Sequence, residues 1–588
     1  MKYSNSKYWD FGAPIAGILL TLSFSPFDYS SFALAALMFL FACWQSISAR
    51  RAALRGYLFG LGAFGSGVSW VYISMHDFGG AGVPDASLLT GLFAAFWALF
   101  PALAGYLWVK VNPGNKRTAR IILQPVIWIL VEYFRGYWVL NGFPWLHIAY
   151  SQLETPLAGY IPVLGVYGAG FMVALTASVA VEIFRMAVRA GILLLGNRSL
   201  RCSTSCILAV VGNRSLRCSR QLLPALLYLL HPWSRTSCIY LLRAVRGVNA
   251  KSAFSTSLRG EGGFIHPGRL KLPLQLMMLL ALLWGMGGLL RNVNWTHEIG
   301  HPLRVSLIQG NISQDQKWRP ENKINTLLKY KKMTEEHWDS NVIIWPETAI
   351  PAYLDQVKDD FLAPLGDDAK RHNTDLVISV PVQETAPQKN FNAVITMGRE
   401  EGMYRKTHLL PFGEYLPLQP LSGFVLNMIN IRLGNFTPGA VNQPLLKVGG
   451  YPFITLICYE DVFGDLSIRG LPDAAFLVNV TNDGWFGDSI EPHQHLQIAR
   501  MRAMETGRFL LRATNTGMTA VVSPKGEIIN QAPLFQEAAL TGTITPMGGM
   551  TPYAKWGDQP VIGGMVILLL GLMGYGRTFK IKDQVRAY

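Results

Sequence analysis

Residues 453–460 read FITLICYE, an apolar run of mostly β-type residues that ends on a cysteine, Cys458, and a carboxylate, Glu460. A short run that is apolar on both faces is typical of a strand buried inside a sheet. The end of such a strand is where a sheet presents reactive groups to a crevice. The stretch therefore predicts a buried strand, and Cys458 is either a structural core thiol, the commoner case for a lone cysteine, or a nucleophile.

Similar runs recur around this one and are separated by helical patterns. The runs are 304–310, 341–347, 375–382, 392–397, 475–483 and 518–524, and the helical patterns are at 321–338 and 493–507. Buried strands that alternate with helices predict a sheet covered by helices. We therefore expect an α/β layered domain of about 240 residues, which is large enough to bury its own core.

Ionisable residues lie at or after the ends of three of these runs. Glu347 ends IIWPE, Lys406 lies in YRKTHLLPFGEYLP eight residues before Glu414, and Cys458 ends the opening run. A cysteine attacks as a thiolate, which a neighbouring cation or base favours. Lys406 can supply the charge, and Glu347 can accept the proton and later return it to a leaving group. Lys406 and the backbone N–H of Tyr459 can then face the oxyanion of a tetrahedral intermediate.

Each of these residues also has a structural interpretation. Lys406 taken alone is interpreted as a surface cation, and Glu347, which lies beside a proline, is interpreted as a helix cap. Glu414 either orients Lys406 or pairs with Arg405. Tyr459 and Glu460, next to the cysteine, are packing residues in the alternative interpretation.

A larger set of motifs carries a resemblance to a known family. The motifs are LSFSPFDY (22–29), SGVSWVY (66–72), FRGYWVLNGFPWLHIAYSQ (134–152), QGNISQDQKW (309–318), IIWPETAIP (343–351), HLLPFGEYLP (408–417), ICYED (457–461), NDGWFG (482–487), QHLQIARMRAMETGR (494–508), RATNTG (512–517) and TPYAKWGDQP (551–560). The contexts of the glutamate, lysine and cysteine resemble the nitrilase superfamily. The whole chain resembles the bacterial apolipoprotein N-acyltransferase family.

The resemblance implies a fold and a set of roles. The implied fold is eight membrane helices with a periplasmic αββα nitrilase-like domain between the seventh and the eighth. Glu347 is then the general base and acid, Lys406 the charge stabiliser and Cys458 the nucleophile. Further positions important in the family match Glu414, Tyr459, Glu460 and Trp318. No metal and no organic cofactor is implied.

The implied reaction is acyl transfer in two steps. A phospholipid of the phosphatidylethanolamine type acylates the thiol, and the thioester then acylates the free α-amine of the diacylglyceryl-cysteine that begins an apolipoprotein. Physical chemistry favours a membrane setting for this reaction. Moving a ~16-carbon chain into water costs about 0.8 kcal/mol per CH₂, on the order of 12 kcal/mol in total.

Composition independently predicts a membrane protein. Half of the 588 residues are hydrophobic and 15% are charged, which is too apolar for an ordinary soluble enzyme of this length. Crossing ~30 Å of hydrocarbon takes about 20 apolar residues. Runs that approach this length lie at 12–25, 32–48, 56–75, 87–109, 119–133, 160–184, 272–290 and 560–576. We therefore expect a polytopic α-helical membrane protein with about eight transmembrane helices and an extracytoplasmic α/β catalytic domain.

Basic residues predict the orientation. They follow the second, fourth and eighth runs, at Arg50, Arg51 and Arg55, at Lys110, Lys116, Arg117 and Arg120, and at Arg577, Lys580 and Lys582. Cytoplasmic loops collect such residues, so both termini are expected in the cytoplasm, and the resemblance implies a bacterial inner membrane. The expected domains are a bundle of about six helices (1–190), a basic loop (191–268), a seventh helix (269–291), the catalytic domain (292–558), an eighth helix (559–577) and a tail (578–588).

The net charge of +15 does not indicate nucleic-acid binding. Between Arg185 and Lys271 there are fourteen basic residues and one acid, a net of +13 in one predicted cytoplasmic loop, for which anionic lipid is the nearer partner. The loop repeats GNRSLRCS at 196–203 and 212–219 and holds four of the six cysteines. A low-complexity insertion with reduced thiols is the favoured interpretation, and weak metal binding the alternative.

Other features leave alternatives open. Trp345, Phe412, Trp485 and Phe486 either shield a thioester or are core and interfacial anchors. Arg135 and Asn141, in FRGYWVLNGFPW, bind a lipid headgroup or close a helix end, and the second is favoured slightly. Two other functions also stay open: a membrane-tethered nitrilase-type amidohydrolase that uses water as the acceptor, and a non-catalytic lipoprotein-binding module.

Overall fold

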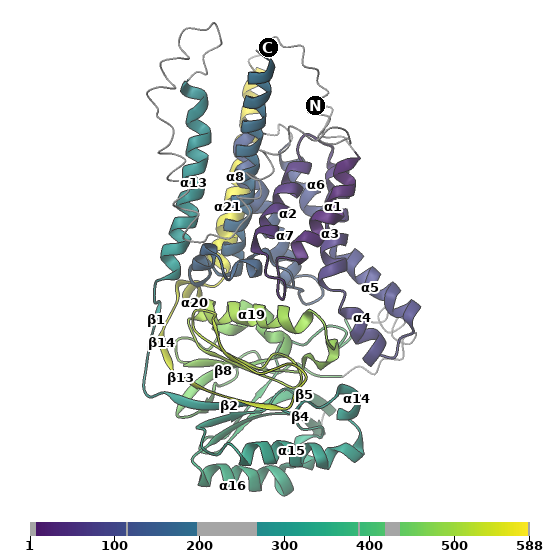
Figure 1. Ribbon diagram of the computed structural model, residues 1–588, viewed down its shortest axis with the longest axis vertical. Coiled ribbons are helices and arrows are strands. Elements are labelled where there is room, and N and C mark those ends of the chain that lie inside the picture. The colour runs from purple at the N-terminus through teal and green to yellow at the C-terminus, as the bar shows by residue number, and fades with distance from the viewer. Residues whose placement is uncertain (1–6, 113–115, 197–266, 386–387, 418–434, 586–588) are drawn as a thin grey trace, which may run out of the picture. The chain divides into compact units, whose positions relative to one another are not determined.

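The segment after residue 292 folds into two sheets that pack face to face (Figure 1). A computed structural model of the protein describes residues 7–112, 116–196, 267–385, 388–417 and 435–585. These residues form two compact units, Met1–Ala180 with Leu280–Tyr588, and Val181–Leu279. Most of the predicted basic loop at 191–268, with its four cysteines, lies outside the described residues.

The two sheets have six strands each and share one plan. In the first sheet, β2 (Leu303–Gln309), β3 (Val342–Ile344) and β4 (Asp375–Thr385) are parallel, flanked by β13 (Ala538–Ile544), β5 (Gln388–Met397) and β6 (Gly402–Arg405). In the second, β8 (Tyr451–Ile457), β9 (Phe476–Thr481) and β10 (Leu510–Thr514) are parallel, flanked by β7 (Leu446–Val448), β11 (Ala520–Val522) and β12 (Ile528–Gln531). A small third sheet pairs β1 (Thr296–Glu298) with β14 (Met547–Gly549).

Alternation along each strand produces the layers. Val342 and Ile344 of β3 belong to the core between the two sheets, whereas Ile343 belongs to a second core under the outer helices. Successive side chains of a strand point to opposite faces. A strand that is apolar on both faces therefore packs against the other sheet on one face and against the outer helices on the other. The outer face of the first sheet is covered by α15 (Lys323–Glu335) and α16 (Ala363–Arg371), and α19 (Glu491–Thr506) lies on the opposite side of the domain (Figure 1). The predicted α/β layering is confirmed.

Short helices and turns follow the strands. α14 (Gln314–Lys317) and η4 (Pro320–Asn322) follow β2; η5 (Leu354–Gln356) and η6 (Lys358–Leu362) precede α16; η7 (Cys458–Val462) and α18 (Gly464–Ile468) follow β8; and η8 (Asp483–Phe486) follows β9. α19 ends at Gly507, which adopts the left-handed conformation (φ +63°) common at helix ends. The carboxyl ends of the parallel strands β3 and β8 therefore carry Glu347 and Cys458.

The rest of the described chain is helical. Its elements are α1 (Tyr8–Thr21), α2 (Ser30–Cys43), α3 (Ala49–Gly67), α4 (Val71–Ile73), η1 (Ser74–Phe78), α5 (Val83–Trp97), α6 (Leu99–Val111), α7 (Arg117–Tyr137), η2 (Ile148–Gln152), η3 (Pro156–Tyr160), α8 (Ile161–Gly196), α13 (Pro267–Arg291), α20 (Pro552–Trp556) and α21 (Gln559–Val585). Each of the eight predicted apolar runs overlaps helix, although residues 22–25 and 44–48 lie beyond the ends of α1 and α2.

Fewer of these helices are long and apolar enough to cross a membrane. Three stretches are, at Val83–Val111, Pro156–Val188 and Lys271–Arg291, and a fourth is counted if the pair Ala49–Gly67 and Val71–Phe78, bent by 60°, is one span. Helices α2 and Gln559–Met573 are apolar but shorter. The described residues thus form a helical region with three or four candidate spans, and the expected number of eight is not confirmed.

Charged residues explain part of the difference. Asp10 of α1 forms an ion pair at 2.8 Å with Arg55 of α3, whose side chain is buried. Glu132 and Arg135 of α7 are buried as well. Buried charges inside apolar helices need partners. The Asp10–Arg55 pair joins α1 to α3, whereas Glu132 accepts from the N–H of Ile148 and Arg135 donates to carbonyls of the loop after α7.

Candidate active site

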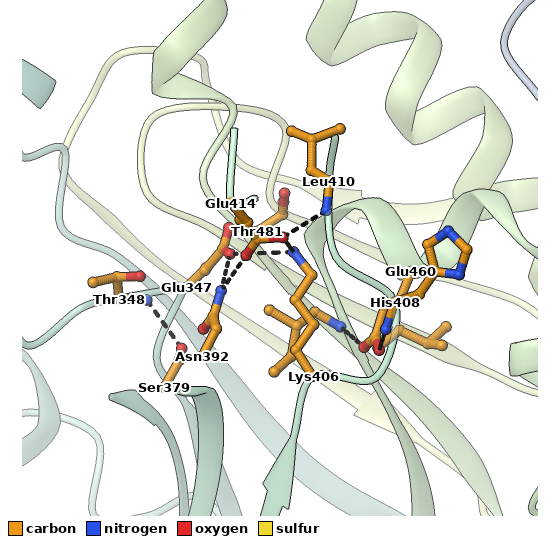
Figure 2. Close-up of polar contacts among 12 residues, drawn as sticks. Glu347, Thr348, Ser379, Asn392, Lys406, His408, Leu410, Glu414, Glu460 and Thr481 are labelled. Carbon is orange, nitrogen blue, oxygen red and sulfur yellow. Dashed lines mark hydrogen bonds and ion pairs between the residues drawn. The ribbon is translucent and has the colours of Figure 1, made fainter. Parts of the chain in front are cut away.

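Three predicted residues lie where strands of the two sheets end, and Figure 2 shows two of them, Glu347 and Lys406. Glu347 follows β3, Lys406 follows β6, and Cys458 directly follows β8. The Lys406 ammonium lies 3.9 Å from a carboxylate oxygen of Glu347. The charges of both groups act on the Cys458 thiol. The structure therefore brings the carboxylate, the ammonium and the sulfur together from three separate stretches of chain.

Lys406 is held by a second carboxylate. Its Nζ lies 2.8 Å from Glu414 Oε2, and its side chain is buried. Asn392 of β5 donates from Nδ2 to Glu347 Oε1 (2.7 Å) and to Glu414 Oε1 (3.0 Å) (Figure 2). Arg405, the alternative partner of Glu414, instead pairs with Glu384 at 2.7 Å. Of the two interpretations of Glu414, the geometry supports the one in which it orients Lys406.

The charges of this cluster support one another. Burial alone would lower the pKa of Lys406, but the carboxylates of Glu414 and Glu347 raise that pKa above its ordinary value. The lysine is therefore a permanent cation at neutral pH. Burial raises the pKa of Glu347, with Lys406 opposing the shift. A carboxyl group with a raised pKa is a stronger base and can also act as an acid near neutral pH.

Cys458 occupies a strained position. Its φ of +50° lies in the left-handed region, which costs a residue with a side chain of order 1 kcal/mol or more. The thiol is half-buried. Burial and the charge of Glu347 raise its pKa well above the ordinary value, although Lys406 lowers it. Burial and the neighbouring carboxylate outweigh the one cation, so a base has to take the thiol proton before the sulfur can attack.

Glu460 organises the turn around the cysteine. Its Oε1 accepts from the Tyr404 hydroxyl, from the backbone N–H groups of Thr407 and His408, and from the Thr407 hydroxyl, at 2.7–3.1 Å. Its Oε2 accepts from the N–H of Ile457 at 2.9 Å. The carboxylate is buried. It thus joins the segment after Lys406 to the end of β8, two residues from the sulfur.

Replacing Glu460 by glutamine should loosen this junction. The amide can accept at only one of the two positions, so an N–H donor such as that of Ile457 loses its acceptor, at a cost of about 1–3 kcal/mol. We expect a lower melting temperature and a loss of turnover of at least ~10-fold. Glu335→Gln, on the exposed face of α15, is the matched control and should change neither quantity. A Glu460→Gln protein with unchanged melting temperature and turnover would exclude this role.

Tyr459 anchors the same turn to the helical region. Its hydroxyl donates to the carbonyl of Gly142 (2.8 Å), and Asn141 donates from Nδ2 to the carbonyl of Leu409 (3.1 Å). Gly142 has a φ of +88°, and a Cβ there would lie 2.1 Å from the carbonyl oxygen of Gly136, so only glycine fits. The loop after α7 is therefore shaped to hold the turns that carry Lys406 and Cys458.

Arg135 supports this loop from within. Its NH1 donates to the carbonyls of Phe143 and Trp145, both at 2.7 Å, and the side chain is buried. These contacts, with that of Asn141, favour the interpretation in which the two residues close a helix end rather than bind a lipid headgroup.

The structure does not bring Trp318 into the cluster. Its side chain is 52% exposed. The preceding residue, Lys317, is buried instead and donates from Nζ to the main-chain carbonyl of Glu347 at 3.2 Å. Burial lowers the pKa of Lys317 to about 8, against the attraction of Glu347. The sequence reasoning missed Lys317, although it lies in the QDQKW motif, because the motif does not tell which of two adjacent side chains points inward.

The four aromatic residues have different surroundings. Trp345 is fully buried in the core under the outer helices, where it stacks on Tyr330 and donates to Thr334 Oγ1 at 2.9 Å. It is therefore a core residue, not a shield. Phe412 and Trp485 are partly exposed. Phe486 packs edge-on against Trp70 of the helical region, with ring centres 4.8 Å apart.

A buried ionic cluster includes residues of the segments that follow β8 and β9. Asp483, Glu491 and His495 are close enough together to serve as metal ligands. Arg512 lies 3.0 Å from Asp483 and from Asp461, and these carboxylates raise the pKa of His495 to about 10 against the effects of burial and of Arg512. A protonated imidazole cannot bind a metal ion. Protein cations thus balance the acidic groups of this cluster.

Both parts of the chain match models of known protein families. Residues 304–552 match the family model of the carbon-nitrogen hydrolases, and residues 16–179 match that of the apolipoprotein N-acyltransferase N-terminal domain. The fold and the site thus define a carbon-nitrogen hydrolase-type enzyme attached to membrane helices. An apolipoprotein N-acyltransferase of Methylococcus capsulatus is 44% identical over 559 residues, 95% of this chain and 94% of that protein. The chain belongs to the apolipoprotein N-acyltransferase family.

Other relatives carry the same name. The protein of Pseudomonas aeruginosa is 35% identical over 564 residues, and that of Coxiella burnetii 34% identical over 559 residues. Each alignment covers 95% of this chain, and 94% and 98% of the respective relative. The similarity therefore includes both the helical region and the α/β domain.

Proposed function

We propose that this N-acyltransferase moves an acyl chain from a phospholipid, of the phosphatidylethanolamine type, to the free α-amine of the diacylglyceryl-cysteine that begins an apolipoprotein. The observation that supports the proposal is the cluster of buried Glu347 and Lys406 with half-buried Cys458, in a domain joined to apolar helices. We propose these three as the catalytic residues.

The first step forms a thioester. Glu347 takes the proton of Cys458 as the sulfur attacks the acyl carbonyl, because burial keeps the thiol neutral until a base acts on it. The Lys406 ammonium and the backbone N–H of Tyr459 stabilise the oxyanion. Glu347 then gives its proton to the departing alkoxide, and a lysophospholipid leaves.

The second step forms an amide. The α-amine attacks the thioester carbonyl and loses a proton to Glu347, and the sulfur leaves and is protonated again. Glu414 and Asn392 hold the Lys406 and Glu347 side chains throughout. Glu460 and Tyr459 hold the turn that carries the sulfur.

Contacts with the helices support a membrane setting for this chemistry. Gln494 of α19 accepts at Oε1 from the indole N–H groups of Trp70 (3.3 Å) and Trp145 (2.7 Å) and donates to the carbonyl of Gly67 (3.1 Å). Together with the bond from Tyr459 to Gly142, they tie the domain to the helices close to Cys458. An enzyme whose site adjoins membrane helices can keep an acyl chain out of water, which saves on the order of 12 kcal/mol for a ~16-carbon chain.

The arrangement in the cell is also part of the proposal. We propose eight transmembrane helices in a bacterial inner membrane, cytoplasmic termini, and a periplasmic catalytic domain at 292–558 between the helices at 269–291 and 559–577. We propose that residues 1–190 form the helical bundle, and that 191–268 and 578–588 are cytoplasmic. The distribution of Lys and Arg supports this orientation.

Mass spectrometry tests the reaction. Purified protein is incubated with phosphatidylethanolamine vesicles, and the peptide that contains Cys458 is analysed before and after addition of a diacylglyceryl-cysteine peptide. We expect an acyl adduct on Cys458 that disappears as the peptide becomes N-acylated. Free fatty acid without N-acylated peptide would instead identify a hydrolase, and phospholipid or peptide binding without either product would identify a binding module.

A further inference from the structure

Thr481 lies beside the nucleophile but belongs to the neighbouring strand. β8 and β9 are parallel, with Ile457 opposite Val480, so the next residues of the two strands are Cys458 and Thr481. Thr481 is fully buried. Two adjacent strand ends therefore place Thr481 beside Cys458.

The hydroxyl of Thr481 donates to a carboxylate that has other donors. Its acceptor is Asp483 Oδ1, at 3.1 Å. The same oxygen accepts from His495 Nδ1 (2.9 Å) and from Arg512 NH2 (3.4 Å), and Oδ2 accepts from Arg512 at 3.0 Å. Asp483 thus remains hydrogen-bonded and charge-paired when the Thr481 hydroxyl turns away.

The charges around Asp483 are held on several elements. His495 of α19 donates from Nε2 to Asp461 Oδ1 (2.8 Å), and Arg512 of β10 donates to Asp461 Oδ2 (3.0 Å). Glu491 lies 3.5 Å from His495 Nδ1. Both nitrogens of His495 face carboxylates, so the ring is an imidazolium, in agreement with its raised pKa. Arg512 and His495 lower the pKa of Asp483 to about 2, although burial opposes this. Asp483 and His495 are therefore charged at neutral pH, whereas burial and the charge of Asp483 raise the pKa of Glu491 well above its ordinary value.

We propose that the Thr481 hydroxyl is a switchable donor to the sulfur of Cys458: it donates to Asp483 while the thiol is protonated, and to the thiolate once the thiol proton has passed to Glu347. No bond to threonine forms or breaks, since its O–H only rotates from one acceptor to the other. The same donor serves the sulfur when it leaves as a thiolate in the second step. This inference rests on the proposed function of Cys458.

Two further observations fit this role. Burial, Glu347 and Asp483 raise the pKa of Cys458, whereas Lys406 and the hydroxyl of Thr481 lower it. The negative charge of Asp483 raises the pKa of Cys458, because it repels a thiolate. The Thr481 hydroxyl, which now donates to Asp483, can offset this repulsion by donating to the thiolate instead.

Alkylation of the thiol tests the switch directly. Apo protein is treated with iodoacetamide over a pH series, and the modified Cys458 peptide is quantified by mass spectrometry. Thr481→Val removes the hydroxyl at constant shape and should move the midpoint upward by about one pH unit, a tenfold loss of thiolate at a given pH, as expected for losing one hydrogen bond to a charged acceptor. Turnover should fall by a similar factor with an unchanged KM.

Three variants make the result specific. Thr481→Ser keeps the hydroxyl and should restore both the midpoint and the turnover, and Thr481→Ala repeats the test if valine does not fold. Thr396→Val is the control: it is buried in β5, and its hydroxyl has no hydrogen-bond partner within the described residues. Unchanged midpoint and turnover in the folded Thr481→Val or Thr481→Ala protein, or a serine variant that behaves like valine, would overturn the proposal. If Cys458→Ala still transfers acyl chains, the proposed function fails, while the alkylation midpoint still reports on Thr481.

Discussion

Replacing Cys458 by alanine should abolish acyl transfer while leaving the protein folded. Without the sulfur no thioester forms, and loss of a nucleophile that works as part of a unit lowers turnover by about four orders of magnitude or more. Stability should change little, because the thiol is half-buried and alanine has the same cost at a φ of +50°. The measurements are N-acylation of a diacylglyceryl-cysteine peptide, the adduct on the Cys458 peptide, and the melting temperature.

Cys43 offers the matched control. It lies in α2, is buried, and donates from its thiol to the carbonyl of Leu40. Cys43→Ala should keep full acyl transfer and a Cys458 adduct, with at most a modest loss of melting temperature. Sustained transfer by Cys458→Ala, or an adduct on Cys43 instead, would exclude Cys458 as the nucleophile.

Replacing Lys406 by methionine should have the second largest effect, on both activity and stability. The side chain keeps its length but loses the charge that faces the Glu347 and Glu414 carboxylates at 3.9 and 2.8 Å. Removing one member of a buried ion pair costs about 3–5 kcal/mol, because the remaining charge is buried without compensation. Without its cation the oxyanion of the first step is also less stable, and we expect thioester formation to slow by ~10²–10³-fold.

Lys332→Met on α15 is the control for a lysine. Its side chain is 77% exposed and its ion pair with Glu336 spans 3.9 Å, so the change should cost under ~0.5 kcal/mol. The assays are the rate of adduct formation on Cys458 in a single turnover and the melting temperature. A Lys406→Met protein that acylates Cys458 at the normal rate would show that Lys406 is structural only.

The layered fold could be predicted because buried strands have a simple pattern. β2, β4, β8 and β9 are rich in apolar residues, and each lies within or near its predicted range. β10 was not predicted, because its sequence LLRAT has an arginine in the middle. Arg512 is nonetheless buried, since Asp461 and Asp483 from two other segments neutralise it. A strand whose buried charge is neutralised by residues far away in the chain cannot be recognised from its own few residues.

The sequence could predict which residues belong to the candidate site, but not which of them contact one another. Motif context selected Glu347, Lys406 and Cys458. It did not decide that Glu414 pairs with Lys406, or that Lys317 rather than Trp318 is buried beside Glu347. These contacts depend on the directions of side chains in turns, where adjacent residues point in different directions and the sequence does not indicate which one points into the site.

The amino-acid sequence by itself determined the apolar helices, the α/β domain, the three candidate site residues and the family, because each depends on a short-range pattern or on short motifs whose residues are adjacent in the chain. Only the tertiary structure decided the protonation of the site and the residues that support it. The pKa of Cys458 is raised because burial and Glu347 outweigh Lys406, and Thr481 follows the strand beside that of Cys458 only because β8 and β9 are in parallel register. Electrostatic and hydrogen-bond energies fall steeply with distance, and folding is what sets the distances between segments far apart in the chain.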